Sequence, residues 1–337
     1  MPTRKPVFDF EEEHLKEEIR KRGAKRVLLQ LPEGLKPEGP RLAKIVDHMG
    51  ATAIVSADPC YGACDLALQE AESLGADLLI HFGHSEMMPQ QRVPVIYVEA
   101  KAALSVKPSV KKALRLLESW KRVGLATTVQ HVDVLGEART MLLESGKTVA
   151  VGDTGNLKYA GQVTGCNYSN VTTIAKDVDA FLFIGGGRFH AVGIALASSK
   201  PTVIADPYEQ TALRIDHEAQ KIVKQRWLNV QEAQKAKTFG VLIGLKTGQK
   251  RIDDAFALKD KIEEKGKKVT LLAIREVTPE ALMQFPTIDA FVNTACPRIA
   301  LDEPSKFRKP VLTVNEMLVV IGELSWEELL RKGWFQG

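Results

Sequence analysis

The side chains best suited to chemistry in this chain are its four cysteines, Cys60, Cys64, Cys166 and Cys296. Two of them share one short run, Ala57–Asp65, and the other two follow about one hundred and two hundred residues later. Four cysteines are too few for a disulfide scaffold in a chain of 337 residues, so metal binding or thiol chemistry is the better interpretation. Gly62, Gly165 and Pro297 mark turns beside Cys64, Cys166 and Cys296, and such turns are where ligands are presented.

The segments that must position these thiols read as an alternation of short apolar strands and helices. The predicted strands are residues 26–31, 53–56, 77–83, 93–98, 123–126, 148–151, 179–184, 201–205, 239–243, 268–272, 289–293 and 310–314. The predicted helices are residues 11–22, 41–49, 66–74, 138–144 and 254–265, with another beginning at Ala191. Strands that are continuously apolar, without alternation, predict parallel sheets covered by helices.

Three sequence signals recur in this pattern: a glycine that ends a helix, an Asp that opens the third strand, and a Pro that opens the fourth. Self-similarity at about one hundred residues predicts three related units, at residues 1–105, 106–212 and 213–337. The expected fold class is α/β, with three related α/β domains and mostly parallel sheets around a central site. The alternative is that strand–helix alternation occurs in any α/β protein.

The cysteines fall at corresponding places in these units. Functional loops of parallel α/β sheets lie beyond the carboxyl ends of the strands. Cys64 and Cys166 follow the second strands of the first two units, and Cys296 follows the third strand of the last. Three thiols can therefore meet, and three thiolates at one point need a metal. Zinc and a four-iron cluster with one open iron both fit, and the spacing leaves the choice open.

Each cysteine taken singly could be a small buried hydrophobic residue instead. For Cys60 this interpretation is the favoured one, because one iron of a cluster has to stay free for chemistry. A joint role for Cys60 and Cys64 as paired ligands is the weaker alternative.

Composition excludes several classes of function. The chain has 46 basic and 42 acidic side chains spread along its length, which is no nucleic-acid footprint, although a mildly basic surface could suit an acidic protein partner. The N-terminal Met1–Pro6 has no apolar segment after its charges, so we expect no secretory signal. No run of about 18 apolar residues occurs, so we expect no membrane span and a cytoplasmic protein.

Seven short motifs occur together and in a fixed order. They are Gln30–Leu35, Tyr61–Asp65, His81–Ser85, Gly165–Asn167, Gly185–His190, Gly244–Gln249 and Ala295–Arg298. Together they resemble the diphthamide-biosynthesis family, the 2-(3-amino-3-carboxypropyl)histidine synthases, and most closely its archaeal homodimeric form. The resemblance covers nearly the whole chain.

This resemblance implies a [4Fe–4S] cluster held by one cysteine of each domain, Cys64, Cys166 and Cys296. It also implies S-adenosylmethionine as co-substrate, although the chain, like the family, lacks the Cys-x3-Cys-x2-Cys run of ordinary radical enzymes of that cofactor. An external electron donor would reduce the cluster. The reduced cluster would break the bond between the sulfur of S-adenosylmethionine and its aminocarboxypropyl group and so release methylthioadenosine. The resulting radical would add to the imidazole C2 of a histidine in translation elongation factor 2. The expected assembly is a homodimer.

The glycine run before the helix at Ala191 is a candidate site for the carboxylate of S-adenosylmethionine. Backbone N–H groups of Gly186 and Gly187 would lie at a helix start, where anions bind. The run is no dinucleotide fingerprint, because His190 stands where the last glycine should be. An ordinary strand-to-helix turn is the alternative.

Four further side chains are candidates for contact with the cofactor. His84 follows a strand end, and Lys246 and Gln249 lie in a glycine-bounded loop of the third unit. Arg298, two residues after Cys296, could pair with the cofactor carboxylate or tune the cluster potential. The respective alternatives are a polar cap, a solvated loop and a structural salt bridge. The radical-forming step demands no general base, so no catalytic acid or base is expected.

Two other functions compete with the synthase. One is a non-catalytic partner subunit that carries zinc or a cluster, although possession of all three cysteines argues against a purely supporting role. The other is an enzyme similar to quinolinate synthase, which uses its open iron as a Lewis acid. The settings Tyr61–Asp65 and Ala295–Arg298 fit that enzyme less well.

Overall fold

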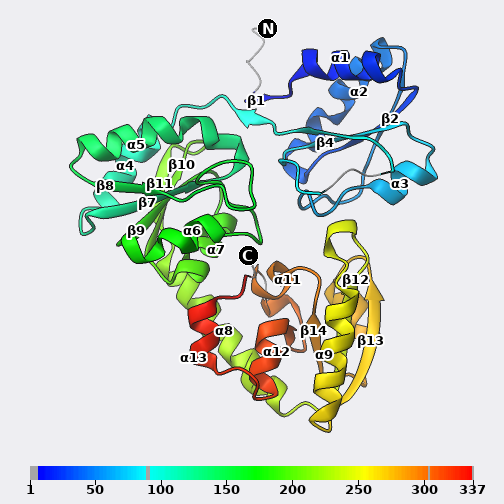
Figure 1. Ribbon diagram of the computed structural model, residues 1–337, viewed down its shortest axis with the longest axis vertical. Coiled ribbons are helices and arrows are strands. Elements are labelled where there is room, and N and C mark those ends of the chain that lie inside the picture. The colour runs from blue at the N-terminus through cyan, green and yellow to red at the C-terminus, as the bar shows by residue number, and fades with distance from the viewer. Residues whose placement is uncertain (1–6, 89–91, 303, 336–337) are drawn as a thin grey trace.

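Three α/β lobes surround a common centre in the computed structural model, which describes residues 7–88, 92–302 and 304–335 (Figure 1). In the first lobe the strands β2 (Arg26–Gln30), β3 (Thr52–Val55), β4 (Leu78–Phe82) and β5 (Val95–Val98) form a parallel sheet of order β3-β2-β4-β5. Burial of β4 on both faces explains its apolar run Leu78–Ile80, and the polar His81 that follows is buried as well.

The other two lobes repeat this order. The second sheet contains β7 (Arg122–Thr127), β8 (Thr148–Val151), β9 (Ala180–Ile184), β10 (Thr202–Asp206) and the antiparallel β11 (Thr211–Arg214), in the order β11-β10-β9-β7-β8. The third contains β12 (Thr238–Gly244), β13 (Lys268–Ile274), β14 (Ala290–Asn293) and β15 (Val311–Thr313), in the order β13-β12-β14-β15. The twelve predicted strands are all present, and the α/β class with mostly parallel sheets is confirmed.

Helices cover the sheets and connect the lobes. In the first lobe they are α1 (Glu12–Arg22), α2 (Gly39–His48) and α3 (Leu68–Ser73), with the 3-10 helix η1 (Glu33–Glu38). In the second they are α4 (Lys107–Leu116), α5 (Leu135–Glu144), α6 (Ser169–Ile174) and α7 (Phe189–Ser198), with η2 (Val129–Val134) and η3 (Ala175–Asp177). In the third they are α8 (Asp216–Gln234), α9 (Ile252–Glu264), α10 (Pro279–Met283), α11 (Pro297–Asp302), α12 (Val314–Val320) and α13 (Trp326–Lys332), with η4 (Thr247–Gln249) and η5 (Pro304–Lys306).

The recurring aspartate has the same structural role in each lobe. The Asp77 carboxylate accepts hydrogen bonds from the backbone N–H groups of Lys25 and Arg26, at 2.6 and 2.8 Å, just where β2 begins. Asp179 does the same at the start of β7, and Asp289 at the start of β12. Each carboxylate therefore ties the start of the third strand to the start of the first.

The long helix α8 was not predicted, and a buried ion pair fixes it to the third lobe. Arg226 is fully buried, and its Nε and Nη2 donate to the Glu316 carboxylate. The guanidinium also donates to the carbonyl oxygens of Ala300 and Val311, and the Trp334 indole N–H donates to Glu316. Every side-chain nitrogen of Arg226 and both carboxylate oxygens of Glu316 therefore have hydrogen-bond partners, as a buried ion pair requires.

Some features were missed by sequence reasoning or stay untested. The short strands β1 (Phe8–Asp9) and β6 (Lys101–Ala102) pair across ninety residues and were not predicted. Strand β11 crosses the predicted boundary at residue 212, and the domain boundaries themselves stay predictions. Residues 1–6, on which the expectation of no signal rests, lie outside the described part. Within that part, no helix combines the length and apolar character needed to cross a membrane.

Candidate functional site

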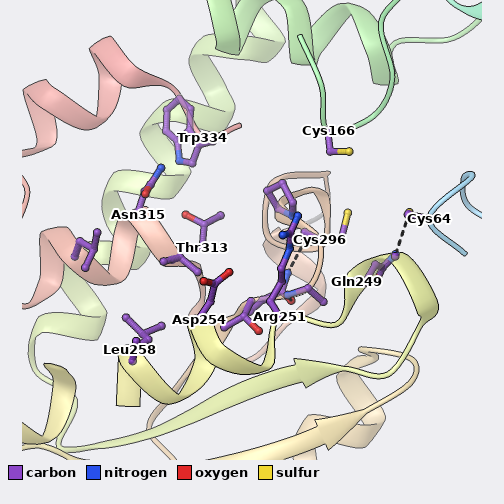
Figure 2. Close-up of a pocket in the computed structure, with 18 of the residues that line it drawn as sticks. Cys64, Cys166, Gln249, Arg251, Asp254, Leu258, Cys296, Thr313, Asn315 and Trp334 are labelled. Atoms are coloured by element: carbon purple, nitrogen blue, oxygen red, sulfur yellow. Dashed lines mark hydrogen bonds between the residues drawn. The ribbon is translucent and has the colours of Figure 1, made fainter. Parts of the chain in front are cut away.

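Loops from all three lobes bring three cysteines to one cavity. Cys64 lies between β3 and α3, Cys166 between β8 and α6, and Cys296 between β14 and α11. Each loop follows the carboxyl end of its strand, as predicted. The three side chains line a cavity of about 300 Å³, and Figure 2 shows them approaching it from separate segments.

The first and third lobes meet directly at Cys64. The backbone N–H of Gly248, in η4, donates to the Cys64 carbonyl oxygen at 2.8 Å. A Cβ atom on Gly248 would lie 2.6 Å from Cys64 Cα, so only glycine allows this approach. The neighbouring Gln249 points its Nε2 at Cys64 Sγ, 3.5 Å away (Figure 2).

Side-chain hydrogen bonds shape the other two cysteine loops. Asn293, the last residue of β14, donates from Nδ2 to the Cys296 carbonyl oxygen, and Thr294 Oγ1 donates to a carbonyl oxygen of β12 at 2.8 Å. Thr164 Oγ1 lies 4.0 Å from Cys166 Sγ and accepts the backbone N–H of Asn167 at 3.2 Å. The thiols therefore sit on loops with defined conformations.

The thiols influence one another electrostatically. The pKa of the Cys296 thiol is raised to about 12, chiefly by burial and to a smaller extent by charge on Cys64 and Cys166, while the backbone N–H of Arg298 acts to lower it. Burial also raises the pKa of Cys64, while the Gln249 amide lowers it. Mutual repulsion of this kind is what a bound metal relieves when it converts thiols to thiolates.

The spacing of these sulfurs is wider than a mononuclear site requires. Among the described residues, the one set of three Cys, His, Asp or Glu ligand atoms within 4.8 Å of one another is a different one, Cys60, His81 and His84. Three thiolates bonded to one zinc at about 2.3 Å would lie about 3.8 Å apart. The wider spacing of the cavity thiols favours a polynuclear cluster.

Arg298, predicted to contact the cofactor, is buried behind Cys296. Its guanidinium lies 3.8 Å from the Phe189 ring centroid, donates to the Phe189 carbonyl oxygen at 2.8 Å and forms a salt bridge with Asp302. The Nη1 atom is buried and has no hydrogen-bond partner among the described residues. A buried cation with an unused donor suits a site whose ligands carry negative charge.

Gln249 is the one predicted cofactor contact that lies among the described residues lining the cavity, and Arg298 is not among them. Lys246, a neighbour of Gln249, is buried and bonded to Asp65 and Glu276, at 2.8 and 2.5 Å, so it joins the first and third lobes. These two ion pairs explain the burial of the Lys246 charge, so no bound ligand is needed to explain it.

The other predicted contacts lie outside the residues that line the cavity. Gly187 has a φ of +72° and its N–H points at the Asp206 carboxylate, 3.4 Å away, so a carboxylate of the chain itself already faces this helix start. Gly186 is exposed beside the Tyr208 ring. His84 is half-buried and its Nδ1 lies 2.9 Å from His81 Nε2. Contacts of Gly186, Gly187 and His84 with the cofactor stay predictions.

Sequence reasoning missed several polar residues of the cavity wall. They are Arg251, Asp254, Lys261, Asn293 and Asn315, and the Trp334 side chain also lines the cavity. Figure 2 labels Arg251, Asp254, Asn315 and Trp334. Two of these polar residues could have been found from their position after predicted strands. Asn293 ends β14 and Asn315 follows β15, so both lie at carboxyl ends of strands. Of the others, Arg251 directly precedes α9, Asp254 and Lys261 lie on α9, and Trp334 lies near the C-terminus, and nothing in their spacing marks them.

Comparison with known proteins agrees with this site. Residues 31–330 match the family model of diphthamide synthesis proteins. The chain belongs to the diphthamide synthesis family. It is 35% identical to the 2-(3-amino-3-carboxypropyl)histidine synthase of Pyrococcus horikoshii over 96% of this chain and 94% of that protein. It is also 30% identical to subunit 1 of the Candida glabrata synthase, over 93% of this chain and 74% of that subunit.

Solved structures agree with the sequence relationships. A crystal structure of Dph2 from Pyrococcus horikoshii with a 4Fe-4S cluster superposes with a TM-score of 0.87 at 34% identity. The match covers 98% of this chain and 95% of that one. The family expected from the seven motifs is therefore confirmed.

Proposed function

We propose that this protein is a 2-(3-amino-3-carboxypropyl)histidine synthase that acts in the first step of diphthamide formation. The observation that carries the proposal is the meeting of Cys64, Cys166 and Cys296, one from each lobe, at a single cavity. The close relatives named for this activity, and the cluster in the related Dph2 crystal structure, support it. The substrates would be S-adenosylmethionine and a histidine of translation elongation factor 2, with a cytoplasmic location to match.

The residues at the cavity fit a [4Fe–4S] cluster held by these three cysteines. The three sulfurs are not all within 4.8 Å of one another, which favours a cluster over one zinc, and the chain provides N–H donors to two of them, from Gln249 and from the Arg298 backbone. Hydrogen bonds to sulfur and burial are the means by which proteins set cluster potentials. When bound, such a cluster supplies an open iron for S-adenosylmethionine and the electron that breaks its bond to the aminocarboxypropyl group.

The chain's own residues would then bind and orient the co-substrate. Arg251 and Asp254 line the cavity before and within the first turn of α9, on the side that carries Gln249 (Figure 2). A guanidinium and a carboxylate side by side complement the carboxylate and ammonium groups of an amino acid. The buried Arg298 guanidinium offsets negative charge of the three thiolates. The three lobes around the cavity would limit the access of water to a reactive intermediate.

An external electron donor and a homodimer are parts of this proposal taken from the family resemblance. The partner-subunit alternative is the weaker one, because every cysteine needed for a complete site is present in this chain. The alternative of a synthase that uses its cluster as a Lewis acid differs in its product, since only the radical reaction releases methylthioadenosine.

The test is transfer of label to the protein substrate. The reconstituted, reduced enzyme is incubated anaerobically with archaeal elongation factor 2 and S-adenosylmethionine labelled in the aminocarboxypropyl group. The proposal predicts label on one histidine of the factor and release of methylthioadenosine. Replacement of that histidine should abolish the labelling. Release of 5′-deoxyadenosine, or absence of label from a cluster-loaded enzyme, would contradict the proposal.

A further inference from the structure

A second group of metal-ligating side chains lies in the first lobe, outside the residues that line the cysteine cavity. Cys60, His81 and His84 each offer one ligand atom, and these atoms lie within 4.8 Å of one another. Cys60 is 1% exposed and His81 is fully buried, while His84 is half-buried at the edge of the group. The proposed reaction uses none of these three side chains as a ligand.

The amide of Gln30 determines which nitrogen of His81 is free. Its Nε2 donates to the Asp65 carbonyl oxygen at 2.6 Å and its Oε1 accepts the Ala67 N–H at 3.1 Å, so backbone partners fix the amide orientation. The same Oε1 lies 2.8 Å from His81 Nδ1, which must therefore carry the proton. His81 Nε2 is left with its lone pair, and it faces His84 Nδ1 at 2.9 Å. Metal-binding histidines are held in this way, by a hydrogen bond from the other ring nitrogen.

The sulfur of Cys60 has a matching support. The backbone N–H of Gly62, two residues along the chain, donates to this sulfur and favours the thiolate, although burial is the larger influence and raises the pKa of Cys60 to about 12. A thiol in this position stays protonated until a metal displaces its proton. Two of the three ligand atoms thus already have the hydrogen bonds expected around a bound metal.

We propose that Cys60, His81 and His84 bind one divalent transition-metal ion of the zinc type, at a site separate from the three-cysteine cavity. One thiolate and two imidazole nitrogens are ligands that zinc prefers. Two nitrogens bonded to one zinc lie about 3.4 Å apart, so His81 and His84 need to separate by only about 0.5 Å from 2.9 Å. The fourth ligand would be water.

Binding at this site involves no redox change. The metal replaces the thiol proton of Cys60 and the hydrogen-bonding proton between the two rings, and His84 remains a neutral ligand by carrying its proton on the other nitrogen. The ion would connect the loop that contains Cys64 to the end of β4. It would thereby hold one ligand of the cavity in place without taking part in the chemistry.

The test is metal content of the full-length chain after anaerobic reconstitution with iron and sulfide, followed by zinc and gel filtration. We expect about one zinc per chain in the parent and in the control His48→Gln, which changes an exposed histidine of α2. Cys60→Ser and His84→Gln should bind zinc at least tenfold more weakly while their iron content stays at the parental value. An absence of zinc in the parent, or equal zinc affinity in Cys60→Ser, would overturn the proposal.

A cobalt measurement covers the case in which Cys60→Ser does not fold. In a chain carrying Cys64→Ala, Cys166→Ala and Cys296→Ala, Cys60 is the one remaining thiol. The proposal predicts that Co²⁺ added to this chain gives a thiolate-to-metal charge-transfer band with one equivalent bound. Absence of the band would overturn the proposal and would show that zinc in the parent belongs to the cavity cysteines.

Discussion

Replacing Gly248 by alanine should disturb the contact between the first and third lobes at Cys64. The added Cβ would lie 2.6 Å from Cys64 Cα, 2.7 Å from its Cβ and 2.9 Å from its carbonyl oxygen. Carbon atoms in contact prefer about 3.5–4.0 Å, so the two loops must separate by about 1 Å. The obstructing atoms belong mainly to the backbone, so no flexible side chain can move aside.

The expected cost is about 1–3 kcal/mol, the usual range for an overpacked interior, and most of it falls on the position of Cys64. A 1 Å displacement of one cluster ligand should lower both the iron retained after reconstitution and the rate of methylthioadenosine release, the latter about a hundredfold. The assay compares iron content, thermal midpoint and product formation in Gly248→Ala and Gly136→Ala. A Cβ on Gly136, in α5, meets no atom within 4 Å, so this control should behave like the parent. Parental iron and rate in Gly248→Ala would refute the reasoning.

Three further predictions follow from contacts away from this glycine. Glu316→Gln leaves the buried Arg226 guanidinium without its counter-charge and should cost about 3–5 kcal/mol of stability, measured by denaturant unfolding; an unchanged midpoint would contradict a structural role for the pair. Asp179 has its pKa lowered to about 2, first by its hydrogen bond to Arg122, from an ordinary 3.8, so its contribution is complete above about pH 4 and is lost as the pH falls through 2. Asp179→Asn should therefore have a lower thermal midpoint than the parent at pH 5 and above, and this difference should shrink as the pH falls toward 2. A difference that stays constant with pH would show that ionisation of Asp179 does not cause it. Gln249→Ala removes an N–H donor from a cavity thiol and should lower the cluster's reduction potential in a redox titration, whereas an unchanged potential would mean that the amide acts only in packing.

The fold was largely predictable because its signals are local. Continuous apolar runs mark buried parallel strands, and the aspartate at the start of every third strand recurs because it binds the backbone of the first strand in each lobe. Helix α8 was missed because its buried face contains Arg226 and Asn229, polar residues whose burial depends on distant partners. Strands β1 and β6 have two residues each, too few for any periodicity to show.

Site residues could be predicted when their type is rare and has few roles in proteins, as for cysteine. They were harder to predict when the type is common on protein surfaces, as for arginine and aspartate. Three cysteines at carboxyl strand ends could be selected, because sequence position alone places them at the correct edge of each sheet. Arg251 and Asp254 could not, since an exposed charged pair at a helix start has the same sequence signature whether or not a cavity lies beside it. The partners of Lys246 belong to a loop 181 residues away and to its own lobe, and only the folded chain reveals them.

The central claim is that three lobes contribute one cysteine each to a [4Fe–4S] cluster that cleaves S-adenosylmethionine. The most direct measurement is an anaerobic iron and sulfide count, with methylthioadenosine determined after dithionite and S-adenosylmethionine, on the parent and on Cys64→Ala, Cys166→Ala and Cys296→Ala. The account predicts about four iron and four sulfide per parent chain, with cluster and methylthioadenosine lost together in each of the three variants. Full product formation by Cys166→Ala, or a parent that binds one zinc in this cavity and no iron, would contradict it.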